Sequence, residues 1–357
     1  MKKILFLLVF SISLSIPASA QKIAKPTLIP KPPTDAQKQL IQEGVALHDA
    51  KRYDEAIEKY QKVLDENPDC SAAIYELANT LYTKRDTKKA MEMAYRGSKY
   101  KAEELPLFYN IMASIIDDVG KPEDAVKIYL DAIKALGGDK EFVTYLSSLH
   151  YNLGVTYVRL KRYPDSRASL KKAVEYDFRY PSPHYLLAAV YNGTKYRVPA
   201  MLAAARFISL EFNSDRTRSS AAIFRNGLRP PSKDEKGNIQ IFVNPDSPTD
   251  EGEFMMYDLL LGTLTVGKDD KDKNKTEAEI FVDAVDTFIS LLAEDKKLAS
   301  TFVGKNYVPF LAELKSKGFV KPFAYLVLYQ TGDSAGMKWL TENDAQLTSF
   351  IKWAKAY

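Results

Sequence analysis

The sequence predicts a mainly α-helical protein: an α-solenoid of about five helical hairpins, followed by a mostly helical C-terminal region with a short strand-like connector between them. Three observations predict this fold class. A small residue recurs at a nearly constant spacing through the first half, apolar residues recur at helical spacing, and prolines and glycines fall where hairpins would turn. Repeating hairpins of this kind are expected to stack and share one core.

The first twenty residues have the composition of an export signal. A basic start, Lys2 and Lys3, precedes an apolar run and small residues that end at Ala20. The apolar run is shorter than the roughly 18 residues that a membrane-spanning helix needs. We therefore expect residues 1–20 to be a signal peptide cleaved after Ala20, a periplasmic or secreted protein, and no transmembrane segment in the mature chain.

Residues 21–35 form a segment rich in proline and lysine, with four prolines between Pro26 and Pro33. Segments of this composition are extended and act as spacers. We expect a mobile spacer that ends where the first helix begins.

The repeats are expected to occupy residues 36–213. Each has a small anchor residue, and successive anchors are separated by 34, 35, 41 and 34 positions, with one insertion at residues 137–145. The anchors are Gly44, Ala78, Ala113, Gly154 and Ala188. A small residue is required where two antiparallel helices approach closely, and a bulky residue then fills the neighbouring gap. The insertion is expected to extend a loop and the start of the next helix.

The first repeat carries the most complete motif. Its fixed positions are Leu40, Gly44, Leu47, Ala56, Tyr60 and Pro68. The fourth repeat has Gly154 and Tyr157 at matching offsets and Ala173 further on, although Ser166 stands where alanine is typical. These residues and the 34-residue period resemble tetratricopeptide repeats. The C-terminal stretch from Trp339 to Trp353 is also similar to the tails of uncharacterised exported Bacteroidetes repeat proteins.

The resemblance implies a concave binding face made by the first helix of each hairpin. Carrying over the family's groove offsets gives a peptide-binding set rich in tyrosine and asparagine. The set is His48, Tyr75, Asn79, Tyr82, Asn110, Asp117, Tyr151, Arg159, Tyr185 and Asn192. Tyrosine offers contact area with a polar tip, and asparagine can bond to a peptide backbone. Ile41 and Val45 stand where the family's chaperone-tail clamp has lysine and asparagine, so recognition of a chaperone's acidic C-terminus is not implied.

The second half of the chain loses the repeat period. Residues 214–250 are expected to form an irregular connector that includes a strand-like run at residues 239–243. Residues 251–357 are expected to be helical, with helices near 251–266, 276–297, 299–317, 320–330 and 337–356. The charged run at residues 268–275 most simply forms a solvated loop, since Asp269, Asp270 and Asp272 lack the rest of a calcium-loop pattern.

The net charge of the chain and its content of cysteine, histidine and catalytic motifs limit the functions that the sequence predicts. The formal net charge is +4, and it becomes +2 when Lys2 and Lys3 are removed, so neither nucleic acid nor an anionic membrane is predicted as the main partner. Cys70 is the only cysteine, and it is interpreted as a filler at a hairpin junction rather than an intermolecular disulfide. Three histidines and no catalytic motif predict no catalytic residue, metal or cofactor. The Asp117 and Asp118 pair is better explained as helix-surface charge.

The sequence therefore predicts a non-enzymatic scaffold or adaptor that binds a protein or peptide along the concave face of the repeats, in the periplasm or cell envelope. Two alternatives stay open. The C-terminal region could be an envelope hydrolase or glycan-processing domain that the repeats supply with substrate, or the protein could be a structural subunit of an envelope assembly. The partner's identity and the oligomeric state are not predicted.

Overall fold

The fold is described from a computed structural model, which describes residues 23, 25–228, 232–233, 239–240, 249–263 and 274–357. The chain divides into two compact units, Met1–Thr156 and Tyr157–Tyr357. The predicted signal peptide, residues 1–20, lies outside the described residues, and export stays a prediction.

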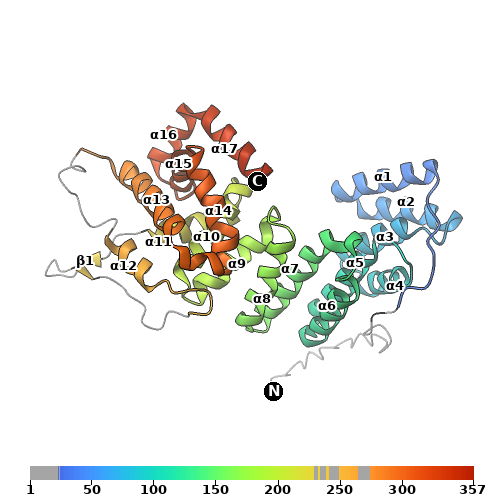
Figure 1. The fold of residues 1–357 in the computed structure, drawn as a ribbon. Helices are drawn as coiled ribbons and strands as arrows, with labels where there is room; N and C mark the ends of the chain where they lie inside the picture. Colours follow the sequence, from blue (N-terminus) through green and yellow to red (C-terminus); the bar gives the residue numbers. More distant parts are fainter. Residues whose placement is uncertain (1–22, 24, 229–231, 234–238, 241–248, 264–273) are drawn as a thin grey trace, which may run out of the picture. The chain divides into compact units, whose positions relative to one another are not determined.

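The first unit is a succession of antiparallel helix pairs (Figure 1). Its first six helices each pack on the neighbour in sequence, and the first helices of neighbouring pairs also pack on one another. The helices are α1 (Asp35–Asp49), α2 (Tyr53–Glu66), α3 (Ser71–Thr83), α4 (Thr87–Gly97), α5 (Leu105–Asp118), α6 (Pro122–Leu136), the short 3₁₀ helix η2 (Lys140–Phe142) and α7 (Val143–Arg159), which runs across the boundary between the units. The insertion at 137–145 forms η2 and the start of α7, as predicted.

The turns inside the hairpins repeat with the same period as the anchors. In each of the five hairpins, the residue seven positions after the anchor has a positive φ, and the next N–H bonds to the carbonyl five residues back. The five turn residues are Lys51, Arg85, Gly120, Lys161 and Lys195, with φ between 59° and 82°. This left-handed helix cap satisfies the last carbonyls of the first helix. The repeat phase is therefore visible in the backbone as well as in the side chains.

The anchor of the first repeat lies against a bulky side chain of the paired helix. A Cβ added at Gly44 would lie 2.4 Å from Cε1 of Tyr60, and the Tyr60 side chain is fully buried. A larger residue at position 44 would have to displace this ring. The steric reason for a small residue at this crossing is therefore present in the structure.

Residues 27–32 of the proline-rich spacer are extended, as predicted, but hydrogen bonds hold them against the repeats, so the expectation of a mobile spacer is wrong for this stretch. Leu28 donates its N–H to the carbonyl of Lys99 at 2.9 Å and accepts from the N–H of Lys101 at 2.8 Å. The side chain of Asn67, which is 1% exposed, donates to the carbonyl of Lys31 at 3.2 Å. The spacer therefore lies along the loops that join α2 to α3 and α4 to α5.

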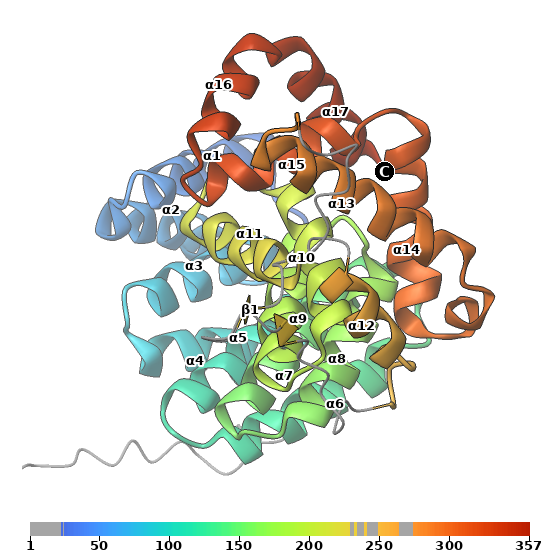
Figure 2. The same cartoon turned by 90° about the vertical axis from the view of Figure 1, so that its left-hand side faces the viewer.

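The second unit is built around one buried helix, α10. Every residue of α10 from Val198 to Leu210 is buried, and the helix packs against α9, α11, α12, α14 and α17 (Figure 2). The elements are α8 (Tyr163–Tyr176), α9 (Pro181–Gly193), α10 (Arg197–Leu210), α11 (Asp215–Gly227), β1 (Ser232–Lys233), β2 (Ile239–Gln240), α12 (Met255–Thr263), α13 (Glu277–Glu294), the 3₁₀ helix η3 (Lys296–Ser300), α14 (Phe302–Ser316), α15 (Val320–Gln330), α16 (Ser334–Glu342) and α17 (Asp344–Ala356).

The connector predicted at 214–250 is wrong in its first third, because α11 occupies residues 215–227. Ser214 caps this helix by accepting from the N–H of Thr217 at 3.2 Å, a signal that the sequence contains. Part of the strand-like run pairs as β2 with β1 in an antiparallel ladder, while residues 241–243 lie outside the described residues.

The prediction of a single helix at 337–356 is also wrong, since the helix is interrupted at Asn343, between α16 and α17. The Asn343 amide donates to the carbonyl of Trp339 at 2.9 Å, and its backbone leaves the helical region. Asparagine competes for backbone hydrogen bonds in this way and favours helix ends. The mainly α-helical fold itself is confirmed. Within the described ranges, no helix has both the length and the hydropathy to cross a bilayer.

The core of the second unit contains a buried cation, Arg206. Its guanidinium donates to the carbonyl of Ala354 at 2.8 Å and to that of Phe178 at 3.3 Å. It also lies 4.5 Å from the ring centre of Phe178 and 4.6 Å from that of Phe310. Burial lowers its pKa to about 10. Because the last carbonyls of a helix carry negative partial charge, the Ala354 carbonyl at the end of α17 offsets part of the cost of burying this cation.

His184 lies beside this cation and is fully buried. One ring nitrogen, Nδ1, is 3.0 Å from the hydroxyl of Tyr307 on α14, and Nε2 is 3.0 Å from the carbonyl of Phe178. Burial, together with Arg206, lowers its pKa to about 3. The helices of the predicted fifth hairpin therefore share their core with the C-terminal helices.

Candidate functional site

The first-helix face of the first unit is the candidate site; it consists of α1, α3, α5 and the part of α7 up to Thr156. It carries seven of the ten predicted binding residues. These are His48, Tyr75, Asn79, Tyr82, Asn110, Asp117 and Tyr151. The other three, Arg159, Tyr185 and Asn192, belong to the second unit.

Four of the seven residues make hydrogen bonds to the next first helix. The bonded atoms are His48 Nδ1 with Thr80 Oγ1 (2.8 Å), the Tyr82 hydroxyl with Asp118 Oδ2 (2.8 Å), Asn110 Oδ1 with Asn152 Nδ2 (2.7 Å) and Asp117 Oδ2 with Thr156 Oγ1 (2.8 Å). Each bond joins one repeat to its neighbour. Such bonds typically contribute about 0.5–1.5 kcal/mol each to stability. These side chains therefore hold the repeats in register, a role that the sequence prediction did not assign to them.

Asp117 and Asp118, interpreted from the sequence as helix-surface charge, turn to different partners. Asp117 is buried and bonds to Thr156, whereas Asp118 accepts from Tyr82 and from Arg85 Nη1 at 3.3 Å. The pKa of Tyr82 is raised to about 12 by burial and by its bond to the Asp118 carboxylate. Both carboxylates thus take part in contacts between helices.

Tyr75 and Asn79 are placed differently, one turn apart on α3. Tyr75 is half-buried, its ring packs edge-on against Phe108 with 6.1 Å between centres, and burial raises its pKa to about 12. Asn79 is half-buried too, and its side-chain amide makes no hydrogen bond to any residue that the structure describes. Tyr82 lies at the next turn, so three of the predicted residues share one stripe of α3.

In the second unit, the predicted residues differ in exposure. The Tyr185 ring packs 5.2 Å from that of Phe207 and lies under the guanidinium of Arg216 at 5.4 Å, which is a packing role. Asn192 and Arg159 are exposed. Sequence offsets alone could not separate these cases, because they place a residue on a helix without saying what covers it.

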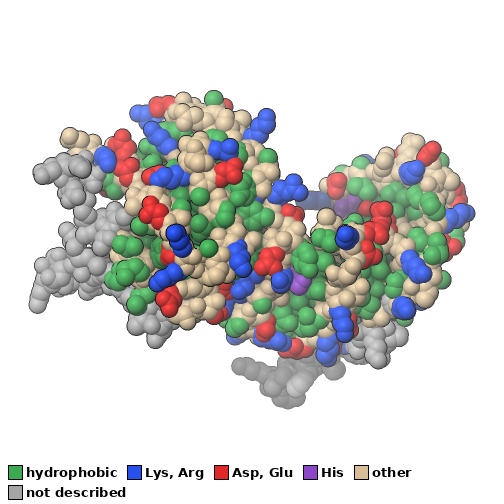
Figure 3. Space-filling view, viewed as in Figure 1, with side chains coloured by type: hydrophobic (Ala, Val, Ile, Leu, Met, Phe, Trp, Pro, Cys, Tyr) green, Lys and Arg blue, Asp and Glu red, His purple; other side chains and the backbone are tan. Residues whose placement is uncertain are grey.

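The surface charge is mixed. On the face shown in Figure 3, lysine and arginine side chains are interspersed with aspartate and glutamate over each unit. Cys70 is a fully buried free thiol at the start of α3, and burial raises its pKa. No group of three or more histidine, cysteine, aspartate or glutamate side chains suited to a metal ion occurs among the described residues.

The comparisons with known proteins identify the repeats. Tetratricopeptide-repeat family models match residues 47–115 and 147–180. No curated protein matches the chain significantly. Solved structures that are similar include pilF of Pseudomonas aeruginosa, with 18% identity, 54% of this chain and 87% of that chain covered, and a TM-score of 0.46.

Two further solved structures are similar to the same extent. A tetratricopeptide-repeat protein of Thermus thermophilus has 22% identity, covers 53% of this chain and 99% of that chain, and has a TM-score of 0.41. PilW, a type IV pilus biogenesis factor, has 14% identity, covers 55% of this chain and 87% of that chain, and has a TM-score of 0.45. The chain thus contains tetratricopeptide repeats, over residues 47–115 and 147–180.

Proposed function

We propose that this protein is an exported, non-enzymatic scaffold whose repeats bind an extended segment of a partner protein along the concave, first-helix face. The observation that carries the proposal is the stripe of Tyr75, Asn79 and Tyr82 on α3. Tetratricopeptide repeats in the chain support the same class of function.

The stripe is suited to a peptide because of the Asn79 amide. A half-buried amide without a hydrogen-bond partner loses part of its hydration and gains nothing in return from the protein. An extended peptide offers backbone N–H and C=O groups that satisfy both ends of such an amide. Tyr75 and Tyr82 flank it on the same helix and add apolar contact area with little loss of conformational freedom.

The docked spacer supports this function independently. The first unit already holds one extended segment, residues 27–32, through main-chain hydrogen bonds and the Asn67 side chain. Loops between the repeat helices therefore present backbone groups that pair with extended chain. On the first-helix face the helix backbone is already hydrogen-bonded, so a partner segment there is recognised by side chains such as Asn79, as Asn67 binds the Lys31 carbonyl.

The test is selection of peptides from a displayed random library against the chain from residue 21 onward, followed by affinity measurement on variants. We expect Asn79→Ala and Tyr75→Ala each to weaken the selected peptides about tenfold, which corresponds to about 1.4 kcal/mol. Gln61→Ala is the matched control. It removes an exposed amide on α2, whose bond to Asp65 at 2.8 Å is local.

Two results would contradict this assignment. If the peptides bind wild type, Asn79→Ala and Tyr75→Ala with equal affinity, the binding site is not on α3. If no selected peptide is displaced from the protein by the same peptide added free in solution, the proposal that the repeats bind peptides is wrong.

The proposed location in the periplasm or cell envelope rests on the anatomy of residues 1–20. Expression in a Gram-negative host with mass measurement of the exported product tests it. We expect a chain that starts at Gln21, and an intact chain retained in the cytoplasm would exclude export.

A further inference from the structure

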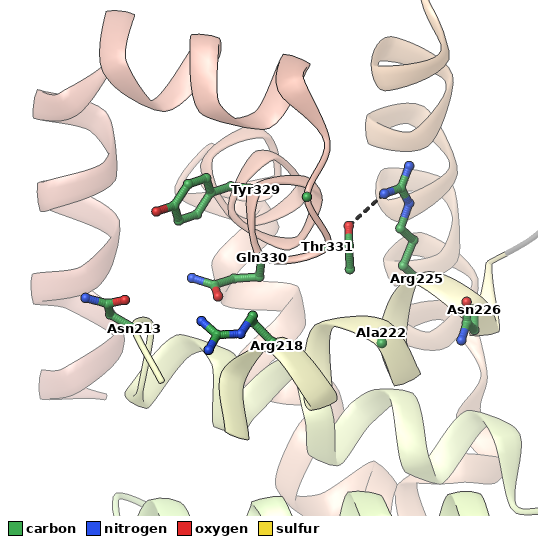
Figure 4. Close-up of a pocket in the computed structure, with 9 residues that line it drawn as sticks. Asn213, Arg218, Ala222, Arg225, Asn226, Tyr329, Gln330 and Thr331 are labelled. Atoms are coloured by element: carbon green, nitrogen blue, oxygen red, sulfur yellow. Dashed lines mark hydrogen bonds between the residues drawn. The ribbon is translucent and has the colours of Figure 1, made fainter. Parts of the chain in front are cut away.

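An open pocket of about 610 Å³ lies in the second unit, between α11 and the C-terminal end of α15. Seven of the nine described residues that line it have polar side chains. The lining residues are Asn213, Arg218, Ala222, Arg225, Asn226, Tyr329, Gln330, Thr331 and Gly332. Figure 4 shows Tyr329 and Gln330 above Arg218, with Asn213 beside them and Arg225 bonded to Thr331.

Among the described residues, the pocket lining contains two arginines and no carboxylate. Arg225 is fixed, since it donates to Thr331 Oγ1 at 2.7 Å and to Asp333 Oδ2 at 2.8 Å. Arg218 is 58% exposed and pairs with Asp215, which is 89% exposed. An ion pair this exposed contributes little, so most of the five Arg218 N–H donors remain available to a ligand.

The side-chain amides of the pocket supply both hydrogen-bond donors and hydrogen-bond acceptors. In the part of the chain that the structure describes, the side chains of Asn213 and Asn226 have no hydrogen bond, and both residues are exposed. Gln330 is 7% exposed, and its Nε2 donates to the carbonyl of Phe212 at 2.7 Å. Since that bond holds the amide nitrogen, the remaining Oε1 is an acceptor at the pocket wall.

The C-terminal end of α15 repels a bound anion less strongly than a helix end with unbonded carbonyls would. The last carbonyls of a helix carry negative partial charge. Here the carbonyl of Leu328 accepts from the N–H groups of Thr331 and Asp333 at 3.1 and 3.0 Å, and that of Tyr329 accepts from Gly332 at 3.0 Å. These bonds cap the helix and reduce the field that the pocket receives from it.

We propose that this pocket binds a carboxylate that has a peptide N–H next to it. The guanidinium of Arg218 and the amide of Asn213 bind the carboxylate, and Gln330 Oε1 accepts the N–H. Either the free C-terminus of a peptide or an acidic side chain on its backbone provides this pair of groups. The site lies in the second unit, and the inference does not rest on peptide binding by the first-helix face.

The test uses three acetylated tripeptides and the full chain from residue 21 onward, with saturation-transfer NMR as the readout. The first has two alanines, a glycine and a free C-terminus. The second is its C-terminal amide, and the third is an amide with glutamate at the middle position. We expect the first or the third to bind, and the second to bind at least about tenfold more weakly. Binding by the first assigns the C-terminus, and binding by the third assigns the side chain.

The variants locate the binding. Arg218→Gln is expected to weaken the binding peptide about tenfold, and Asn213→Ala about threefold. Arg179→Gln is the matched control, because this arginine is 67% exposed and lies outside the pocket. Equal binding of all three peptides, no binding at millimolar concentration, or an Arg218→Gln variant that binds like wild type would each overturn the proposal.

Discussion

The two units use helices in different ways. In the first unit, a helix packs mainly on its neighbours in sequence, and hydrogen bonds such as His48 to Thr80 join one first helix to the next. In the second unit, α10 is surrounded, and Arg206 reaches the carbonyl of Ala354, 148 positions further along the chain. The first arrangement is a sum of local units, whereas the second is a single core that forms only when distant segments meet.

The difference suggests where each unit is vulnerable. A change in the repeats should be felt by the adjacent hairpins, because stability there is close to additive between neighbours. A change at the centre of the second unit should be felt by helices from α8 to α17. Hydrogen exchange, read separately on peptides from the two units, distinguishes these behaviours.

The largest effect is expected from Arg206→Ala. The change leaves the carbonyl of Ala354 without a donor, leaves the carbonyl of Phe178 with only the ring of His184, and opens a cavity between aromatic rings. We expect the free energy of unfolding of the second unit to fall by about 4 kcal/mol. Hydrogen exchange should rise in α8, α10, α14 and α17 and stay unchanged from α1 to α6.

Arg179→Ala is the control for this prediction, because that arginine is 67% exposed and pairs with the exposed Asp177 at 3.9 Å. It should change stability by less than about 0.5 kcal/mol. If Arg206→Ala raises exchange equally in both units, the division into two separately stabilised units does not hold.

An intermediate effect is expected from the pH dependence of His184. The unfolded chain binds a proton at this residue below about pH 6.5, whereas burial holds the folded pKa near 3. Stability is therefore complete above pH 6.5 and falls by about 1.4 kcal/mol per pH unit below it, until about pH 3. We expect the stability advantage of wild type over His184→Gln to shrink by about 2 kcal/mol between pH 6.5 and about pH 5.

The Tyr307→Phe variant tests the cause of this pH dependence. It removes the hydroxyl that bonds to His184 Nδ1 but leaves the ring buried. Its stability should therefore keep the same slope with pH as wild type. Denaturant titrations of the three proteins give the answer, and parallel curves for wild type and His184→Gln would refute the prediction.

The smallest effect is expected from Asn67→Ala in the first unit. This side chain holds the spacer through its bond to the Lys31 carbonyl. Loss of that bond should lower stability by about 1 kcal/mol and raise exchange only at residues 27–32 and the loops beside them. Gln61→Ala, on the exposed side of α2, should change neither quantity. Increased exchange through α3 and α5 as well would show that the spacer is part of the core.

Much of the first unit could be predicted because its signals are local. The anchor at Gly44 and the bulky Tyr60 belong to one hairpin, and the turn at Lys51 follows the anchor at a constant distance. A short stretch of sequence contains everything that such a hairpin needs, and the repetition of the pattern confirms the phase. The same locality explains why the start of α7 could be predicted from the insertion.

The candidate site was predicted only in part. Helix offsets put His48, Tyr82, Asn110 and Asp117 on the first helices, but they could not show that a side chain from the next repeat already bonds to each of them. Asn79 has the same kind of offset and no such partner among the described residues. The pocket beside α11 was missed because it joins residues about 110 positions apart, and no periodic pattern marks it.

The sequence by itself determined that this protein is mainly helical and that its first half repeats, because helix periodicity, caps and close helix crossings depend on residues a few positions apart. The tertiary structure alone decided how the second half folds and which polar side chains remain open to a ligand. The environments of Arg206 and His184 are made by segments that meet only in the folded chain. The burial of a side chain and its hydrogen-bond partners depend on contacts between distant segments, so they cannot be predicted from one segment alone.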